Sequence, residues 1–145
     1  TMSYAVIVSK GVFPLKEALS EEKEDHIRSA CAWTLGQIGR HTPEHALALS
    51  ENDIIRLLIL NFVGSNSSED LKGKCLQAVK AVVAKCNDLF PLFPLLRNSP
   101  PEIQKYLLKQ FSAVLPSDVE ARREFVQSGC LQYIQELAEN KADNL

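Results

Sequence analysis

HIRSACAWTLGQIGR, residues 26–40, carries an apolar side chain at every third or fourth position. This spacing predicts an amphipathic α-helix with one buried stripe. The same stripe returns after 44 residues and again after a further 32. Its members are Ile27, Cys31, Leu35 and Ile38, then Leu71, Cys75, Val79 and Val82, and finally Ile103, Leu107, Phe111 and Val114. Three long helices with one shared stripe favour a repeating all-α fold over a compact, non-repeating helical bundle.

A second element recurs between these helices. A short apolar helix end, a glycine and another apolar helix occur in VSKGVFPLKEAL (8–19) and VQSGCLQYIQEL (126–137), and LSENDIIRLLIL (49–60) occupies the same place without the glycine. A helix, a glycine corner, a second helix and a longer third helix form the plan of an armadillo unit. We therefore predict a single armadillo-type right-handed α-solenoid of about three repeats. The predicted repeat cores lie near 8–40, 49–86 and 87–115, followed by terminal helices in 117–140.

The third repeat is predicted to have shortened connecting helices. Its stripe follows the previous one after 32 residues, whereas the first interval is 44 residues. The connecting segment 87–98 also contains Pro91 and Pro94, which would break it into short turns because proline disrupts a helix interior.

Serines at the starts of periodic segments predict helix N-caps, because their side chains can accept a backbone hydrogen bond there. The candidate N-caps are Ser99 and Ser117, each followed three residues later by the glutamate of a capping box, and the pair Ser67 and Ser68.

Glycines give two further expectations. Gly11, Gly64 and Gly129 lie where periodic segments end, and each can take the left-handed conformation that a helix C-terminus often needs. Gly36 and Gly39 lie within or at the end of one helix, where each would cost about 1 kcal/mol relative to alanine. The simplest compensation is the close approach of a neighbouring helix.

Composition excludes several classes of protein. Among 145 residues, 46% are hydrophobic and 23% charged, the net charge is −2 and the pI is near 5.9, so no global charge favours nucleic acid or an anionic membrane. The apolar run Leu57–Leu60 is far too short to span a bilayer. The four cysteines, Cys31, Cys75, Cys86 and Cys130, form no C-x-x-C motif. Free, mostly buried thiols in a reducing, cytoplasmic compartment are therefore expected.

Three stretches resemble a known family: AVIVSKGV (5–12), HIRSACAWTLGQIGRHTPEHA (26–46) and QFSAVLPSDVEARREFVQSG (110–129). They are similar to the C-terminal part of the sperm-associated antigen family, armadillo-repeat proteins of the central apparatus of the flagellar axoneme. The resemblance implies a non-enzymatic scaffold of the cytoskeleton that supports flagellar motility. It also implies partners among other central-apparatus or microtubule-associated proteins, with no cofactor.

The family proteins are longer and have more repeats toward the N-terminus. The resemblance therefore implies that this chain is a piece of a longer array whose first repeat is uncapped. An uncapped repeat interface is apolar, so we expect self-association through residues 2–19.

The stretch HTPEH (41–45) matches H-x-x-E-H, a pattern of zinc hydrolases, and raises the alternative of a metal-dependent enzyme. Such a site needs both histidines on one continuous helix, yet Pro43 stands between them and restricts Thr42 to an extended conformation. Thr42 is instead a natural N-cap, Pro43 a first helical residue and Glu44 a favourable first-turn acid. We therefore predict a corner, with His41 and His45 on either side of it, and no catalytic or metal site.

The candidate protein-binding residues are His26, Trp33, Gln37 and Arg40, which share the face opposite the buried stripe. In peptide-binding armadillo proteins, a tryptophan and an asparagine one turn later hold an extended ligand. Here Trp33 and Gln37 take those places, which gives a soluble, peptide-binding adaptor as a second hypothesis. The matching positions are Gln77 and Ala81, then Lys109 and Ala113, so the ladder does not continue. A tryptophan that packs under a neighbouring helix is an equal alternative.

Four lysines, Lys72, Lys74, Lys80 and Lys85, suggest an acidic partner such as a tubulin tail. On a helical projection they scatter, so solvated lysines around one exposed helix are the better interpretation.

Overall fold

The computed structural model describes the backbone of residues 2–143 and the side chains of residues 10–141. Within this range the chain forms eight α-helices and two short 3₁₀ helices, and no β-strand. In chain order they are α1 (Met2–Glu21), α2 (Asp25–Gly39), α3 (Pro43–Glu51), α4 (Ile54–Val63), α5 (Glu69–Lys85), η1 (Phe93–Leu95), α6 (Pro101–Val114), η2 (Leu115–Ser117), α7 (Val119–Gln127) and α8 (Cys130–Asp143).

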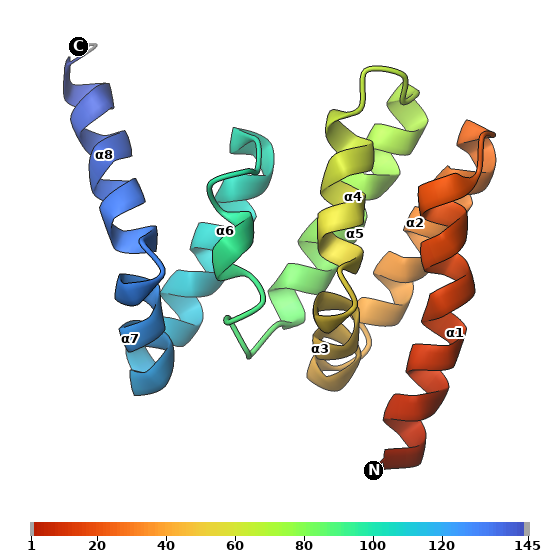
Figure 1. The fold of residues 1–145 in the computed structure, drawn as a ribbon, viewed down its shortest axis with the longest axis horizontal. Helices are drawn as coiled ribbons and strands as arrows, with labels where there is room; N and C mark the ends of the chain where they lie inside the picture. Colours follow the sequence, from red (N-terminus) through yellow and green to blue (C-terminus); the bar gives the residue numbers. More distant parts are fainter. Residues whose placement is uncertain (1, 144–145) are drawn as a thin grey trace.

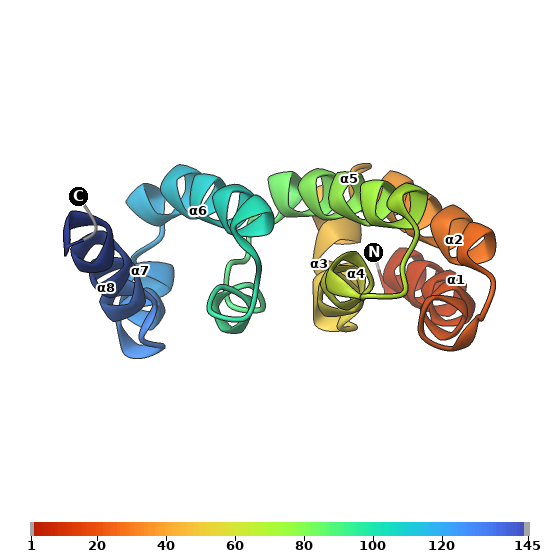
Figure 2. The ribbon, with the colours of Figure 1, turned by 90° about the horizontal axis from the view of Figure 1, so that it is seen from above.

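The helices lie in two rows along the long axis of the molecule (Figures 1 and 2). One row consists of α2, α5 and α6, and the other contains α1, the α3–α4 pair, the short segment around η1, and the α7–α8 pair. Helices pack both along a row, as α2 does on α5, and between the rows, as α4 does on α5, and the buried side chains form one core cluster. The all-helical prediction is confirmed, and the arrangement is compatible with an α-solenoid.

The predicted stripes form much of this core. Eleven of the twelve stripe residues are buried or partly buried, and the four on α5 lie in the centre of the core. The exception is Ile27, whose side chain is 36% exposed. It lies in the first turn of α2, and within the described residues α2 has a row neighbour, α5, on only one side.

The helices α2 and α5 pack closely because glycine lines their contact. A β-carbon on Gly39 would stand 2.8 Å from the side chain of Leu49 on α3 and would overlap Val82 on α5. Gly36 likewise lies against the backbone of Ala78. The predicted close approach of a neighbouring helix is therefore confirmed.

The predicted glycine corner at Gly11 is wrong, because α1 runs without a break from Met2 to Glu21. Val12 and Leu19 are both buried and lie seven residues apart, two turns along one helical face. Packing of this face keeps the helix continuous despite Gly11 and Pro14. Gly129 does adopt the expected left-handed conformation, with φ of 89°, between α7 and α8.

The other helix ends confirm some predictions and correct others. Gly64 ends α4 but has an extended conformation, with φ of −61° and ψ of 131°. Ser68 is the N-cap of α5, and its hydroxyl accepts a hydrogen bond from the N–H of Leu71 at 3.1 Å.

The N-caps predicted at Ser99 and Ser117 are wrong. The Ser99 hydroxyl donates to the carbonyl of Leu95 at 2.6 Å, and Pro100 takes the N-cap place of α6. Ser117 ends the 3₁₀ turn η2, so the N-cap of α7 moves one residue on to Asp118, which accepts a hydrogen bond from the N–H of Ala121 at 3.0 Å.

Between α5 and α6 the only helical element is the three-residue η1, as the two prolines predict. Phe93 of η1 anchors this segment, because its ring lies 5.2 Å from that of Phe111 on α6 and 6.0 Å from that of Phe125 on α7. These distances are typical of aromatic pairs.

All four cysteines are free and buried, as predicted. Burial raises the pKa of both Cys75 and Cys86 to about 12, so these thiols are un-ionised at neutral pH.

Candidate protein-binding groove

A groove runs over the row formed by α2, α5 and α6. Its first hollow, of about 280 Å³, lies between α2 and α5. It is lined by Trp33, Gly36, Gln37 and Arg40 of α2 and by Lys74, Gln77, Ala78 and Ala81 of α5. Three of the four candidate binding residues therefore meet at one place. The small side chains of Gly36 and Ala78 form its floor, since this is where the two helices approach most closely.

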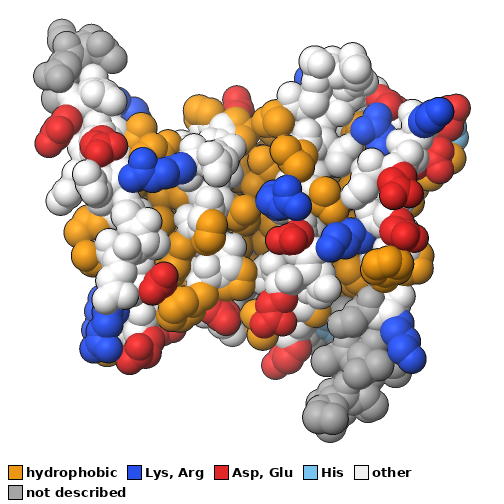
Figure 3. All heavy atoms as spheres, in the orientation of Figure 1, with side chains coloured by type: hydrophobic (Ala, Val, Ile, Leu, Met, Phe, Trp, Pro, Cys, Tyr) orange, Lys and Arg blue, Asp and Glu red, His pale blue; other side chains and the backbone are white. Residues whose placement is uncertain are grey.

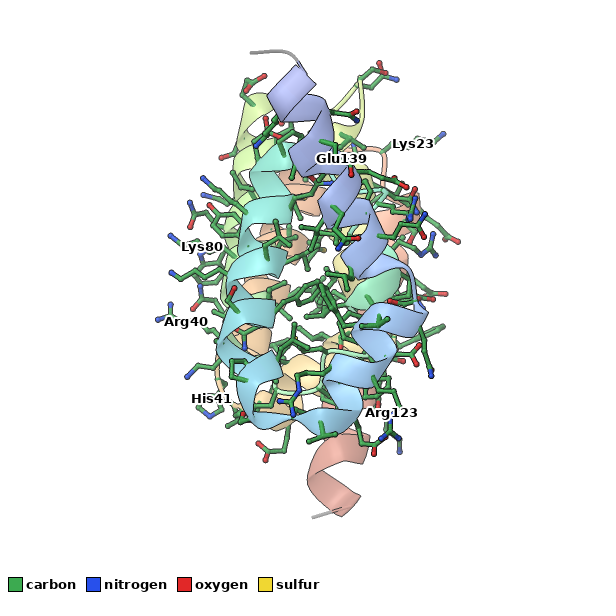
Figure 4. The ribbon with its side chains drawn as sticks, turned by 90° about the vertical axis from the view of Figure 1, so that its left-hand side faces the viewer. Lys23, Arg40, His41, Lys80, Arg123 and Glu139 are labelled. Carbon is green, nitrogen blue, oxygen red and sulfur yellow. The ribbon has the colours of Figure 1, made fainter. Side chains whose placement is uncertain are left out.

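Two further hollows continue the groove along the row. The second, of about 420 Å³, shares Arg40, Gln77 and Ala81 with the first and adds Lys80, Ala84 and Lys85. The third, of about 80 Å³, shares Lys80 and Ala84 and reaches Tyr106, Lys109 and Gln110 of α6. Figure 4 shows Arg40 and Lys80 projecting from the same side of the molecule. We call these three hollows together the row groove.

Trp33 stands at the α2 end of the row groove with 54% of its surface exposed. No neighbouring helix within the described part of the chain covers it, whereas Leu35, two residues on, is fully buried. Next to it, Arg40 donates a hydrogen bond to the side-chain carbonyl of Gln37 at 3.5 Å. The tryptophan is thus available as an aromatic contact for a partner.

His26 lies apart from the other three candidates. It is in the first turn of α2, exposed to solvent, and its Nδ1 is 3.7 Å from a carboxylate oxygen of Glu24. It is not among the residues that line the row groove.

The row groove is basic. Five cationic side chains line it, and none of the described residues that line it is acidic. The five are Arg40, Lys74, Lys80, Lys85 and Lys109. One of them, Lys74, has an anionic neighbour, the carboxylate of Asp70 at 3.8 Å. Lys80 also lies over the ring of Tyr106, 5.9 Å from its centre.

Sequence reasoning missed this charge because it considered α5 alone. Viewed along one helix, the lysines scatter, and Lys72 is not a groove residue. The positive surface forms only when α5 stands between Arg40 of α2 and Lys109 of α6. The one available signal was Lys109, the basic residue that takes the place of Trp33 on the third helix.

The stretch HTPEH forms the predicted corner. Helix α2 ends at Gly39, α3 begins at Pro43, and Thr42 is the N-cap, whose hydroxyl accepts a hydrogen bond from the N–H of His45 at 3.2 Å. The Thr42 hydroxyl also lies 2.7 Å from Nδ1 of His45. The sequence did not predict that the two histidine rings meet edge to face, with centres 5.1 Å apart.

The electrostatics of the corner favour a neutral His45. Burial and the neighbouring His41 lower the pKa of His45 below its ordinary value of 6.5, and Glu44 opposes this shift. The pKa of Glu44 itself is lowered by hydrogen bonds from its own N–H and from the Thr42 side chain. Across the described residues no group of three or more His, Cys, Asp or Glu side chains is arranged to hold a metal ion.

A polar network that the sequence did not reveal ties both rows together. Asp25 of α2 accepts a hydrogen bond from the N–H of Ser68 at 2.7 Å and forms an ion pair with Arg28. Arg28 donates to the side-chain carbonyl of Asn61 on α4 at 2.8 Å, and the Asn61 amide donates to the carbonyl of Leu57 at 2.9 Å. A lone asparagine within the apolar helix IIRLLILNFV was the only signal.

Comparison with known proteins identifies relatives of this chain. Over 123 residues, which are 85% of the chain, it is 50% identical to sperm-associated antigen 6 of Homo sapiens. Over these residues the chain is homologous to sperm-associated antigen 6. Its identity with sperm-associated antigen 6 of Mus musculus is 49% over the same length. The family resemblance seen in the sequence is thus confirmed.

The chain spans 24% of the length of sperm-associated antigen 6. No protein-family model matches it. None of the helices in the described residues is both long enough and apolar enough to cross a membrane. The homology therefore covers 85% of this chain but only about a quarter of the length of its relatives.

Proposed function

We propose that the chain is a non-enzymatic, protein-binding scaffold of the flagellar axoneme, in its central-pair apparatus. The observation that carries the proposal is the 50% identity with sperm-associated antigen 6 over 123 residues, since that name associates the relative with sperm. The two packed helix rows support it, because arrays of this kind present long surfaces to other proteins. The partners would be other central-apparatus or microtubule-associated proteins.

The repeat assignment forms part of this proposal. An armadillo unit contains two shorter helices followed by a longer third one. Here α3 and α4 would be the two shorter helices, and α5, which follows them in the chain, the longer third one. The segment around η1 and α6 would be a second unit with reduced connecting helices. The α1–α2 and α7–α8 pairs would then belong to units at the two ends of the described array.

Detergent extraction of flagella that express the tagged full-length protein tests the scaffold. We expect the protein to remain with the extracted axonemes and to be lost from axonemes that lack the central pair. Crosslinking mass spectrometry on the same axonemes would then join Lys72, Lys80 or Lys85 to central-pair proteins. Release of the protein into the detergent-soluble fraction would contradict the proposal.

The metal-dependent hydrolase alternative is tested separately. Elemental analysis of the purified chain would detect bound zinc, and a hydrolase screen would detect turnover. We expect neither. Stoichiometric zinc that is lost on substituting both His41 and His45 would favour the enzyme instead.

The row groove supports a second candidate function, the binding of an extended, acidic segment of a partner. Five cations without a lining carboxylate favour an anionic ligand, and the exposed Trp33 offers an apolar or aromatic contact at one end. The three hollows share residues, so one extended chain could lie across all of them.

Fluorescence anisotropy with a labelled glutamate-rich peptide tests this binding. Lys80→Glu and Trp33→Ala should each weaken the complex several-fold, and affinity should fall as salt is added. The matched control is Lys23→Glu, an exposed lysine that projects from the opposite side of the molecule in Figure 4. An equal loss in the control, or tighter binding of a lysine-rich peptide, would contradict an acidic ligand.

A further inference from the structure

A different surface, on the opposite row, is left open by the shortened segment before α6. There α4 packs against α1 on one side. On the other side its neighbour is η1, which has only three residues. A ten-residue α-helix such as α4 is about 15 Å long, and three residues of 3₁₀ helix cover about 6 Å. Hydrogen-bonded turns on both sides of η1 extend this neighbour from Leu89 to Ser99, so α4 faces an irregular segment there and not a second regular helix.

An apolar hollow of about 390 Å³ marks this place, and we call it the α4 hollow. It is lined by Ile59 and Leu60 of α4, by Pro94, Leu95, Asn98 and Ser99 of the shortened segment, and by Arg56. In the centre of the face in Figure 3, hydrophobic side chains gather over α4 and the segment beside it. A cavity of about 150 Å³ can hold a benzene ring, so this hollow has room for two or more apolar side chains.

Exposed side chains on α4 continue the apolar surface of the α4 hollow along one face of that helix. Arg56, Leu60 and Val63 follow one another at spacings of four and three, which places them on one helical face. Leu60 is 50% exposed and Val63 a similar fraction. Large apolar side chains exposed in series on a helix are typical of a surface that another protein covers.

The charge of Arg56 indicates which kind of side chain a partner that covers this surface would carry. Arg56 is the single ionic residue among the lining side chains, and it is exposed. The four ion pairs within the described residues involve other side chains, so Arg56 has no carboxylate within 4.0 Å there. An acidic residue beside the apolar face of a partner would supply that carboxylate.

We propose that the α4 hollow receives apolar side chains of an amphipathic helix of a partner protein, which lies over α4 and the segment around η1. The spacing of Arg56, Leu60 and Val63 suits a partner helix with apolar residues at positions i, i+4 and i+7, packed on α4 at a normal helix–helix distance. An acidic residue on the flank of that apolar face pairs with Arg56. The second interval between the buried stripes is shorter than the first by a dozen residues. A helix of a dozen residues is about 18 Å long, which is close to the length of α4.

Selection from a displayed library of amphipathic helices tests the proposal on the whole 145-residue chain. The library varies the apolar face among Leu, Ile, Phe and Met, and the flanking position among Glu, Asp, Lys and Arg. We expect helices with Glu or Asp at the flank to be enriched on the native chain but not on Leu60→Asp. Enrichment of Lys or Arg, or equal enrichment on both chains, would overturn the proposal.

Binding of a selected, labelled helix then gives the matched comparison. Leu60→Asp should weaken it about tenfold or more, because it places a carboxylate in the apolar contact. Val119→Asp, which changes a 57% exposed apolar residue on α7, should leave it within about twofold. Arg56→Glu should also weaken binding, and a helix whose acid is changed to Lys should restore it. This charge exchange keeps the test decisive if Leu60→Asp fails to fold.

A second copy of the chain is the competing occupant. Sedimentation velocity of the chain alone distinguishes it: a dimer that Leu60→Asp dissociates would overturn the partner-helix proposal. Loss of helix binding on Trp33→Ala but not on Leu60→Asp would also overturn it, because it would place the helix in the row groove.

Discussion

Gly36 of α2 lies so close to Ala78 of α5 that a β-carbon at residue 36 would stand 2.9 Å from the α-carbon of Ala78. The closest atom is backbone, which cannot move aside as the tip of a flexible side chain can. This contact brings together the two long helices that carry the first two stripes. It also sets the floor of the row groove, because Gly36 and Ala78 both line the first hollow.

Gly36→Ala is therefore expected to destabilise the chain. The added methyl group must push α2 away from α5, and overpacking of this kind costs about 1–3 kcal/mol of unfolding free energy. Urea unfolding followed by circular dichroism measures the change. Gly73→Ala is the matched control, since Gly73 also lies within a helix but a β-carbon there would meet nothing within 4 Å. It should raise the unfolding free energy by about 0.5–1 kcal/mol, and a loss of stability there would contradict this account.

The N-cap of α7 differs between the sequence-based prediction, which was Ser117, and the structure, where it is Asp118. Asp118→Ala should cost about 1 kcal/mol, because it removes the acceptor for the N–H of Ala121. Ser117→Ala should stay within about 0.5 kcal/mol, since the Ser117 hydroxyl donates only to the carbonyl of Val114. Thermal unfolding of the two variants compares them directly. The reverse order of effects would restore Ser117 as the N-cap.

Asp25 should make the free energy of unfolding depend on pH in the acidic range. The Ser68 N–H and the Arg28 guanidinium hold the pKa of Asp25 below its ordinary value of 3.8. A lowered pKa means that this stabilisation is present above pH 3.8 and is lost as the pH falls through the lower, folded-state pKa. Asp25→Asn should therefore destabilise the chain at pH 7, and its difference from the native chain should shrink toward pH 3.

The control for Asp25 is Asp70→Asn, which changes an exposed first-turn acid of α5. Urea unfolding across this pH range should show a smaller effect for Asp70→Asn at pH 7. A difference between Asp25→Asn and the native chain that stays constant from pH 7 to pH 3 would refute the role of the Ser68 and Arg28 contacts.

The pKa of His45 should depend on its neighbour His41. Because the pKa of His45 is lowered from 6.5, the unfolded chain binds the proton more readily, and the unfolding free energy falls as the pH drops below 6.5. The fall ends below the folded-state pKa. His41→Gln removes the neighbouring charge, so NMR titration should show the pKa of His45 rising toward 6.5.

His26→Gln is the control for this titration, because His26 is exposed and lies in the first turn of α2, away from the corner. It should leave the titration of His45 unchanged. A native His45 that titrates at or above 6.5 would contradict both the burial of the ring and the influence of His41.

The sequence by itself determined most of the helices and most of the sides they bury. The apolar period places Leu71, Cys75 and Val79 on one face wherever α5 stands, and all three are buried. It also located the corner at Thr42, because a proline restricts its predecessor and a threonine can cap within a few residues. These properties are local, so a short stretch of chain contains all the residues that decide them.

The tertiary structure alone decided which surfaces meet. The helix α1 continues through Gly11 because burial of Val12 and Leu19 favours one long helix over the local preference of glycine. The row groove needs Arg40, Lys80 and Lys109 side by side, from three helices far apart in the chain. The α4 hollow likewise depends on how the segment around η1 packs beside α4 in space. Periodicity encodes the face that each helix buries, but the neighbour that covers it is chosen only when the helices pack.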